Sequence, residues 1–203
     1  MTLRRWSFGD PVDPLRRFLR GGGVAAIPTE SSYGLGALPD HETGVEAIYR
    51  MKERQRGKPL PVVVGDRSQL ELLGIDSRSR AIAGAAAVWP APLSVIVPVS
   101  RPVAAAAGRG TLAVRIPGHR RLRELLVELG SPLTATSANR AGRKPVLDPA
   151  ELESALPGWE GWIVDDGQLP GGLPSTMVIR EGDGWKVVRS GAVSPDSLPE
   201  VGA

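Results

Sequence analysis

The stretch Pro28-Thr29-Glu30-Ser31-Ser32-Tyr33-Gly34-Leu35-Gly36 follows an apolar run over residues 24–27 that predicts a buried strand. It combines hydroxyls, a carboxylate, a phenol and two glycines, so we expect a chemically active loop rather than an element of the core. Loops at strand ends carry binding groups because the sheet holds them rigidly. The residues alone leave two interpretations open, a plain turn or a pocket wall with polar groups from Thr29, Ser31 and Tyr33.

Strand and helix patterns alternate along the rest of the chain. Apolar runs predict further strands over residues 60–64, 93–99, 112–116, 133–136, 162–164 and 177–179. Apolar residues at helical spacing predict helices over residues 44–54, 79–88 and 120–129. Thr43 and Glu46 form a capping box for the first of these helices, and Asp148 with Pro149 begins a further one. The mixture indicates an α/β or α+β sheet domain.

The composition is that of one globular domain and excludes several kinds of chemistry. The 203 residues are 41% hydrophobic and 23% charged and contain no cysteine, which excludes disulfides and zinc-thiolate sites. His41 and His119 lack partners at metal-ligand spacing, so we expect both at the surface and predict no metal site. No apolar run approaches the roughly 18 residues of a membrane span, and we expect no signal peptide and a cytoplasmic protein.

Four cations stand at alternate positions from the end of the first predicted helix onward, in the pattern Lys52-x-Arg54-x-Arg56-x-Lys58. One interpretation is a solvated helix end, where cations offset the helix dipole. The other is a cradle for a polyphosphate, because both side chains bind phosphate oxygens. The pattern is not a Walker A motif, since Pro59 stands where that motif needs serine or threonine.

Arg115 lies within an otherwise apolar strand pattern over residues 112–117. An unpaired buried charge is costly, so this guanidinium must meet a ligand anion, an acidic side chain or solvent. The sequence leaves all three possibilities open.

Two more polar segments adjoin predicted strands. Ser137 and Asn139 follow a strand, either as ligand-binding groups or as an Asx or Ser turn. Ser175 and Thr176 precede the last strand run, and Arg189 lies at the end of the strand expected after it. That second arrangement is also typical of an ordinary β-hairpin.

Taken together, the motifs form a specific series: Pro28-Thr29-Glu30-x-x-Tyr33-Gly34-Leu35-Gly36, Lys52-x-Arg54 with Lys58-Pro59-Leu60, Trp89-Pro90-x-Pro92-Leu93, Ala113-Val114-Arg115-Ile116-Pro117, Ser137-Ala138-Asn139-x-x-Gly142, Pro174-Ser175-Thr176 and Arg189-Ser190-Gly191. The series resembles the YrdC-like family of threonylcarbamoyl-AMP synthases in its short, single-domain form. The resemblance implies a twisted open mixed sheet with flanking helices and a concave basic face. It covers a catalytic domain over residues 22–191, with an N-terminal segment at 1–21 and a tail at 192–203. We expect residues 193–203 to form a frayed tail.

The resemblance also implies a reaction. L-threonine, bicarbonate and ATP would give threonylcarbamoyl-AMP and pyrophosphate, the first step of tRNA t6A37 modification. Mg2+ is expected on the triphosphate, held mainly by phosphate and water. Transfer RNA or other proteins of the t6A pathway are possible partners, and no membrane is involved. The alternative is an RNA-binding module of the same fold without catalysis.

Each site residue receives a role from its match to the family motifs. Thr29 would touch L-threonine, Arg115 would pair with its carboxylate, and Tyr33 would belong to the same substrate-binding group. Lys52 and Arg54 would hold the ATP phosphates and, with Arg115, form the catalytic set. The remaining matches are Ser175 or Thr176 for the substrate, Ser137 and Asn139 for the nucleotide, and Arg189 beside the phosphates.

The chain departs from the family pattern at several positions. Ser31 and Ser32 stand where the family loop has threonine or alanine and then an apolar residue. Ala141 replaces a serine, and Ala91 replaces the glycine of a Trp-Pro-Gly-Pro run. None of these changes removes a charged ligand group, but the doubled serine raises the question of substrate preference.

Overall fold

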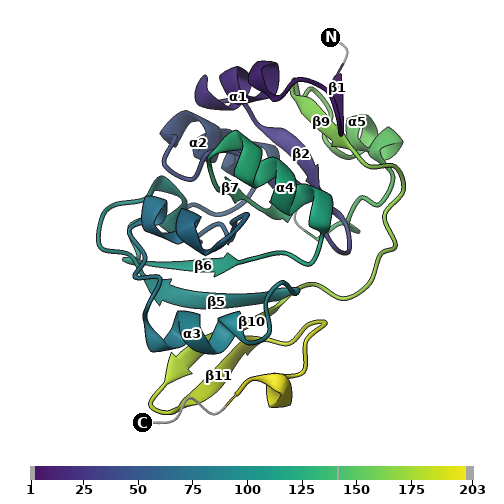
Figure 1. Cartoon of the computed structure of the whole chain (residues 1–203). Coiled ribbons are helices and arrows are strands. Elements are labelled where there is room, and N and C mark those ends of the chain that lie inside the picture. Colours follow the sequence, from purple (N-terminus) through teal and green to yellow (C-terminus); the bar gives the residue numbers. More distant parts are fainter. Residues whose placement is uncertain (1–2, 141, 200–203) are drawn as a thin grey trace.

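The computed structural model describes residues 3–140 and 142–199, which form two mixed β-sheets with helices around them (Figure 1). The first sheet has the order β1-β9-β2-β3-β8, with strands β1 (Arg4–Ser7), β9 (Trp162–Asp165), β2 (Ala25–Pro28), β3 (Tyr33–Gly36) and β8 (Thr136–Ser137). The second has the order β11-β10-β5-β6-β4-β7, with strands β11 (Gly184–Arg189), β10 (Thr176–Glu181), β5 (Leu93–Pro98), β6 (Thr111–Arg115), β4 (Val62–Val63) and β7 (Leu133–Thr134). The predicted α/β class is confirmed, with the strands divided between two open sheets.

The predicted helices are present with slightly shifted ends. The α-helices are α1 (Val12–Arg20), α2 (Glu42–Met51), α3 (Arg80–Ala86), α4 (Arg120–Leu129) and α5 (Leu152–Ala155), and short 3-10 helices lie at Arg67–Leu73, Ala104–Ala106, Pro149–Glu151 and Pro195–Ser197. The Asp148 cap is confirmed, because its Oδ1 accepts from the Ala150 amide at 2.8 Å. The capping box is wrong, since α2 begins after His41 and no side chain caps it. Within the described ranges, no helix has the length and apolarity needed to cross a membrane.

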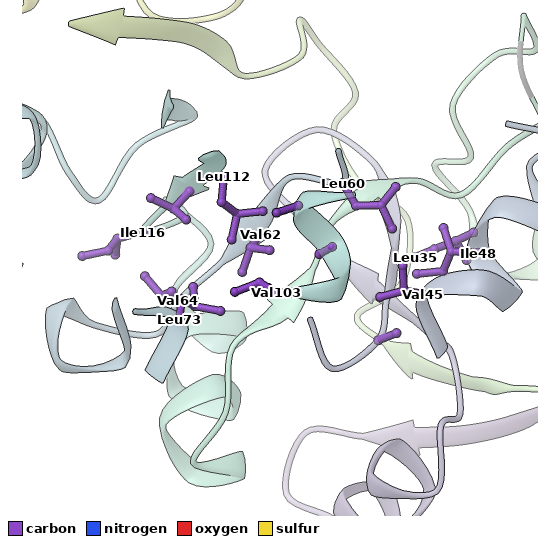
Figure 2. Packing of buried hydrophobic residues seen from close by; sticks show 14 of the residues in the cluster. Leu35, Val45, Ile48, Leu60, Val62, Val64, Leu73, Val103, Leu112 and Ile116 are labelled. Carbon is purple, nitrogen blue, oxygen red and sulfur yellow. The ribbon is translucent and has the colours of Figure 1, made fainter. Parts of the chain in front are cut away.

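Two apolar clusters pack on opposite faces of the first sheet. Figure 2 shows the larger cluster, in which Leu35 of β3 meets Val45 and Ile48 of α2. The second cluster lies under α1 and α4, which pack against each other. Successive residues of β2 contribute to different clusters, Ala26 to the first and Ile27 to the second. Burial on both faces explains why residues 24–27 read as a continuous apolar run.

The loop prediction was wrong for residues 33–36, which form the fully buried strand β3. This strand pairs antiparallel with both β2 and β8. A Cβ on Gly34 would lie 3.3 Å from the Thr136 carbonyl oxygen, and one on Gly36 would lie 3.2 Å from a methyl carbon of Ile27. The two glycines therefore permit close packing, but they also lower the strand propensity that the sequence pattern relies on.

The first and the last described segments of the chain pack against the rest of the fold. The N-terminal segment holds β1, which pairs in parallel with β9, and α1, whose Leu15 and Leu19 are buried. At the other end, Leu198 is 7% exposed and belongs to the larger apolar cluster. The expectation of a frayed tail is therefore wrong for residues 193–199, because apolar burial holds them, and residues 200–203 lie outside the described ranges.

The strand predicted over residues 133–136 divides between the two sheets. Leu133 and Thr134 pair with β4 in the second sheet, while Thr136 and Ser137 pair with β3 in the first. Between them, the Ala135 amide donates to the Pro61 carbonyl at 2.8 Å. The chain thus crosses from one sheet to the other just before the polar segment that contains Asn139.

Candidate active site

A cavity of about 1190 Å³ is lined by residues from both sheets and from the segments between their strands. The predicted site residues that line it are Thr29, Tyr33, Lys52, Arg54, Arg115, Ser137, Asn139, Ser175 and Arg189. Thr176 is fully buried and does not line the cavity. Of the two hydroxyls considered for holding the substrate, the fold therefore brings only that of Ser175 to the cavity.

The charged side chains that line the cavity are all cationic in the described ranges: Lys52, Arg54, Lys58, Arg115, Lys144 and Arg189. Like charges in a concave site with a low dielectric raise the local concentration of ligands of the opposite sign. The arrangement is therefore suited to carboxylates and phosphates, as the expected concave basic face implied.

Arg115 is buried at the end of β6 and pairs with a carboxylate from the β2–β3 turn. Its Nη2 lies 3.3 Å from Glu30 Oε2, and the two side chains are 7% and 17% exposed. Glu30 Oε1 also accepts from the Gly118 amide at 2.7 Å. Arg115 therefore combines two of the predicted environments, a structural ion pair and a position facing the cavity, while the exposed edge is wrong.

The hydroxyl of Thr29 is hydrogen-bonded within the turn between β2 and β3. The Thr29 amide and Oγ1 both donate to the Ser32 carbonyl, at 3.1 and 2.7 Å. Thr29 and Ser32 are nevertheless buried residues of the cavity wall, with Ser31 beside them. The tight turn leaves the Thr29 oxygen free to accept a further hydrogen bond, because a hydroxyl oxygen has two lone pairs.

The Tyr33 hydroxyl is hydrogen-bonded to the backbone of the segment after β9. It donates to the Gly167 carbonyl at 2.8 Å and accepts from the Asp166 amide at 3.1 Å. Burial, the largest cause, raises the pKa of Tyr33 to about 12. Tyr33 is therefore neutral near pH 7, and its hydroxyl ties β3 to the segment after β9.

Lys52 follows the last turn of α2 and bridges to the segment after β8. Its Nζ donates to the Asn139 carbonyl at 2.6 Å and also to the Ser137 carbonyl. Burial, and then the charge of Arg54, lower the pKa of Lys52 to about 8. The ammonium thus sits among neutral acceptors, in an environment that an anionic ligand would relieve.

Three buried polar atoms of cavity residues have no hydrogen-bond partner in the described structure. They are Arg54 Nε, Arg115 Nε and Asn139 Oδ1. Other groups on these side chains are occupied, since Arg54 Nη2 donates to the Pro59 carbonyl at 3.1 Å and Asn139 Nδ2 donates to the Arg140 carbonyl at 3.1 Å. Buried polar groups are normally satisfied, so these atoms point to a bound ligand or water in the working protein.

Arg189, at the end of β11, is fixed by Ser175. Its Nη2 donates to the Ser175 carbonyl at 2.7 Å and to Ser175 Oγ at 2.9 Å, and its Nε reaches the same carbonyl at 3.2 Å. Ser175 Oγ in turn lies 3.1 Å from Ser94 Oγ. Burial, and then the nearby charge of Arg115, lower the pKa of Arg189, and both residues line the cavity.

Comparison with known proteins identifies the family of this chain. A family profile for Sua5, YciO and YrdC proteins, described as "Telomere recombination", matches residues 17–191. The chain belongs to the Sua5/YciO/YrdC family. A threonylcarbamoyl-AMP synthase of Chromohalobacter salexigens is 38% identical over 168 residues, which are 78% of this chain and 86% of the relative. Another, from Bacillus subtilis, is 33% identical over 99% of this chain and 62% of its own length.

Solved structures of the Sua5/YciO/YrdC family share the fold. Pyrococcus abyssi Sua5, solved in complex with L-threonine, aligns with a TM-score of 0.81 and 28% identity over 94% of this chain and 58% of its own. Escherichia coli YciO aligns with a TM-score of 0.79 and 25% identity, over 96% of this chain and 98% of its own. This chain therefore spans nearly all of YciO and little more than half of Sua5.

Two residues of the site could not be assigned a role from the family motifs, namely Glu30 and Lys144. Glu30 was part of the motif but received no role, and its partner Arg115 is 85 residues away in the chain. Lys144 lines the cavity and was not considered. Its signal was the basic run formed with Arg140 and Arg143 directly after Asn139. Among the departures from the family, Ala141 lies outside the described residues.

The surface prediction for His119 was wrong. Its side chain is 13% exposed, and its Nε2 lies 3.0 Å from Asp166 Oδ2. Its Nδ1 accepts from the Leu122 amide and so caps the start of α4. His41 is half-buried beside the start of α2. Over the described ranges, no three acidic or histidine side chains gather in a way that could hold a metal ion.

Proposed function

We propose that this chain is a threonylcarbamoyl-AMP synthase that uses L-threonine, bicarbonate and ATP. The observation that carries the proposal is the large cavity in which buried Arg115, next to the Thr29 turn, faces a set of cations that includes Lys52, Arg54 and Arg189. One carboxylate-binding arginine and a cluster of phosphate-binding cations match an amino acid and a nucleoside triphosphate. The names of the relatives from Chromohalobacter salexigens and Bacillus subtilis support the same reaction.

The reaction has two steps. The amine of threonine attacks the carbon of bicarbonate, and water leaves as the carbamate forms. A carbamate oxygen then attacks the α-phosphorus of ATP, and the bond to the bridging oxygen breaks so that pyrophosphate departs. Such displacements depend on positioning and on neutralised charge more than on a side-chain nucleophile. A site composed of cations, hydroxyls and amide groups is therefore sufficient.

The residue roles are those that the family motifs imply. Arg115 binds the carboxylate of threonine, and its Nε has no hydrogen-bond partner in the described structure. Lys52 and Arg54 neutralise the phosphates, and Arg189 contributes beside them. Ser137 and Asn139 line the nucleotide side, while Thr29 and Ser175 line the threonine side.

Mg2+ enters this proposal as part of the ATP substrate. Magnesium retains several waters and is usually bound through phosphates and few carboxylates. The cavity offers it no carboxylate from the described residues, so the triphosphate and water supply its ligands. Transfer RNA and other proteins of the t6A pathway act downstream, on the released adenylate, and the proposed reaction belongs to the cytoplasm.

The test follows pyrophosphate release from ATP, Mg2+ and bicarbonate with a panel of amino acids. We expect release with L-threonine and little with alanine or valine, and omission of bicarbonate should abolish the signal. Release with serine but not threonine would keep the chemistry and overturn the substrate, a result to which Ser31 and Ser32 would be relevant. No release with any amino acid, together with salt-dependent RNA binding, would favour the non-catalytic RNA-binding module.

A further inference from the structure

The segment that follows β11 is joined to the segment that precedes β10. We call residues 174–176 and 191–193 together the clasp. The Ala192 amide donates to the Pro174 carbonyl at 2.9 Å. Thr176 Oγ1 donates to the Val193 carbonyl at 2.6 Å and accepts from the Val193 amide at 3.0 Å. Three hydrogen bonds thus close the clasp, and a single hydroxyl makes two of them.

The clasp leaves no room for a side chain at Gly191. A Cβ there would lie 2.2 Å from the Pro174 carbonyl oxygen and 2.5 Å from the Thr176 amide nitrogen. Both atoms belong to the backbone and cannot swing away as a flexible side chain does. The close approach of the two segments therefore depends on glycine at this position.

The chain beyond the clasp is anchored at a second point. Trp185 Nε1, on β11, donates to the Pro199 carbonyl at 3.1 Å, and Leu198 is buried in the larger apolar cluster. The anchored residues, Leu198 and Pro199, lie beyond residue 191, where the match to the family profile ends. The last described residues thus support the clasp from outside the region that the family profile matches.

The two site residues nearest the clasp are Ser175, within it, and Arg189, two positions before Gly191. Arg189 makes all its described side-chain hydrogen bonds to Ser175. It also lies close enough to Arg115 for that charge to disfavour its protonated form. Like charges in one pocket repel each other, and the hydrogen bonds to Ser175 oppose a movement of the Arg189 guanidinium away from Arg115.

We propose that Thr176 is a positioning residue that acts through Arg189, and that the clasp and the anchored residues 194–199 hold Arg189 in the cavity. The identity of the ligand that Arg189 meets, the triphosphate of ATP, rests on the proposed function. The restraint itself does not, because it is a property of the hydrogen bonds around Ser175. Thr176, expected from the motif to touch the substrate, is assigned this role instead.

A double-mutant cycle tests whether Thr176 acts through Arg189. Thr176→Val removes both hydroxyl hydrogen bonds and keeps the side-chain volume, and we expect KM for ATP to rise about tenfold with a smaller change in kcat. In an Arg189→Ala background the same substitution should change KM less than about twofold. Thr176→Ser, which keeps the hydroxyl, should restore most of the wild-type KM.

The matched control is Thr134→Val. Thr134 is also fully buried, and its Oγ1 likewise donates to a carbonyl, that of Leu35 at 3.1 Å, and accepts from an amide, that of Ala37 at 2.9 Å. We expect a comparable drop in melting temperature for both valine variants, but no change in KM for ATP with Thr134→Val. Equal KM changes in the two variants, or additivity of Thr176→Val with Arg189→Ala, would overturn the proposal.

A readout without substrates separates this proposal from the proposed function. In 15N-labelled protein, the Arg189 Nε–H signal, assigned with Arg189→Lys, should exchange slowly with solvent because it donates to the Ser175 carbonyl. Thr176→Val should speed its exchange at least tenfold, while Thr134→Val should not. Unchanged exchange in Thr176→Val overturns the clasp, whereas a wild-type protein that shows slow exchange but releases no pyrophosphate overturns only the proposed reaction.

Discussion

Arg115 and Lys52 line the same cavity, but Arg115 pairs with a charged side chain and Lys52 with neutral backbone groups. Arg115 faces the carboxylate of Glu30 at 3.3 Å, and both side chains are largely buried. Lys52 donates to the backbone carbonyls of Ser137 and Asn139, and in the described ranges it meets no acidic side chain within 4 Å. A carbonyl oxygen carries only a partial charge. The charge of Arg115 is therefore offset within the protein, whereas that of Lys52 is not.

This difference matches the ligands of the proposed reaction. A guanidinium whose charge is already balanced, such as that of Arg115, orients a singly charged carboxylate without binding it strongly. The neighbouring Glu30 fixes the position of the guanidinium. Uncompensated cations attract a triphosphate strongly and stabilise the charge that moves onto pyrophosphate as it leaves. We therefore expect binding of threonine to depend on alignment and binding of ATP to depend on charge.

Loss of the uncompensated cation should have the largest effect. With Lys52→Ala, we expect kcat/KM for ATP to fall by about 100-fold to 1000-fold, because removing one preorganised donor from the transition state costs that much. Pyrophosphate release at saturating threonine measures it. Lys186→Ala is the matched control, since Lys186 is 60% exposed and pairs with Glu181 at the surface. Turnover of Lys52→Ala close to that of Lys186→Ala would remove Lys52 from the site.

Removal of the offset cation should act mainly on threonine. With Arg115→Ala, we expect KM for threonine to rise by about 10-fold to 100-fold, the cost of one or two charge-assisted hydrogen bonds. The variant also leaves Glu30 buried without its partner, which should lower the free energy of unfolding by about 3 kcal/mol. Urea denaturation and initial rates measure the two effects.

A double variant separates the stability effect from the binding effect. Arg115→Met with Glu30→Gln removes both charges, so we expect the free energy of unfolding to recover while KM for threonine stays high. Recovery of threonine use in this double variant would show that Arg115 serves the fold alone. A large rise in KM for ATP but not for threonine would reverse the assignment of the two cations.

The lowered pKa of Lys52 predicts that ATP affinity depends on pH. The free ammonium loses its proton as the pH rises through about 8, so affinity for ATP should fall by up to about tenfold per pH unit above that value. Because the folded pKa is below the ordinary 10.5, the unfolded chain binds more protons between these values. The contribution of Lys52 to stability therefore rises with pH in the same window.

Calorimetric titration of ATP between pH 7 and pH 10 measures this dependence without turnover. Lys52→Arg should bind ATP with little change over that range, because a guanidinium stays protonated. A wild-type affinity that is as flat as that of Lys52→Arg would show that Lys52 does not meet the phosphates.

The sequence predicted the elements whose own residues show an apolar pattern typical of a buried strand or helix. β5 and β6 are mostly apolar, and α4 begins and ends where its leucine spacing predicts. β3 was missed because two of its four residues are glycines, which lower strand propensity. Their role in close packing shows only in the fold, where Ile27 and Thr136 lie beside them. α1 was missed although Val12, Leu15 and Leu19 stand at helical spacing, because charged residues and a proline separate them.

The site shows the same division between local and long-range information. The motifs named most of the residues that line the cavity, but they also named Thr176, which is buried outside it, and they missed Lys144. They could not say where hydroxyls point, because the partners of Tyr33 and Thr176 lie elsewhere in the chain. The pairing of Glu30 with Arg115 likewise joins residues that are 85 positions apart in the chain, so neither motif alone could indicate it.

The smallest expected effect on threonine binding concerns Tyr33, which the family motifs place in the substrate-binding group with Arg115. Tyr33→Phe removes the hydrogen bonds to Gly167 and Asp166, so we expect the free energy of unfolding to fall by about 1 to 2 kcal/mol. KM for threonine should stay within about twofold of the wild type, because the hydroxyl is already occupied by the backbone. Tyr49→Phe is the control, since that hydroxyl also donates to a backbone carbonyl, that of Lys58 at 2.7 Å. A tenfold rise in KM for threonine in Tyr33→Phe alone would mean that the hydroxyl turns to the substrate, and that threonine is bound by side chains other than the Arg115 pair.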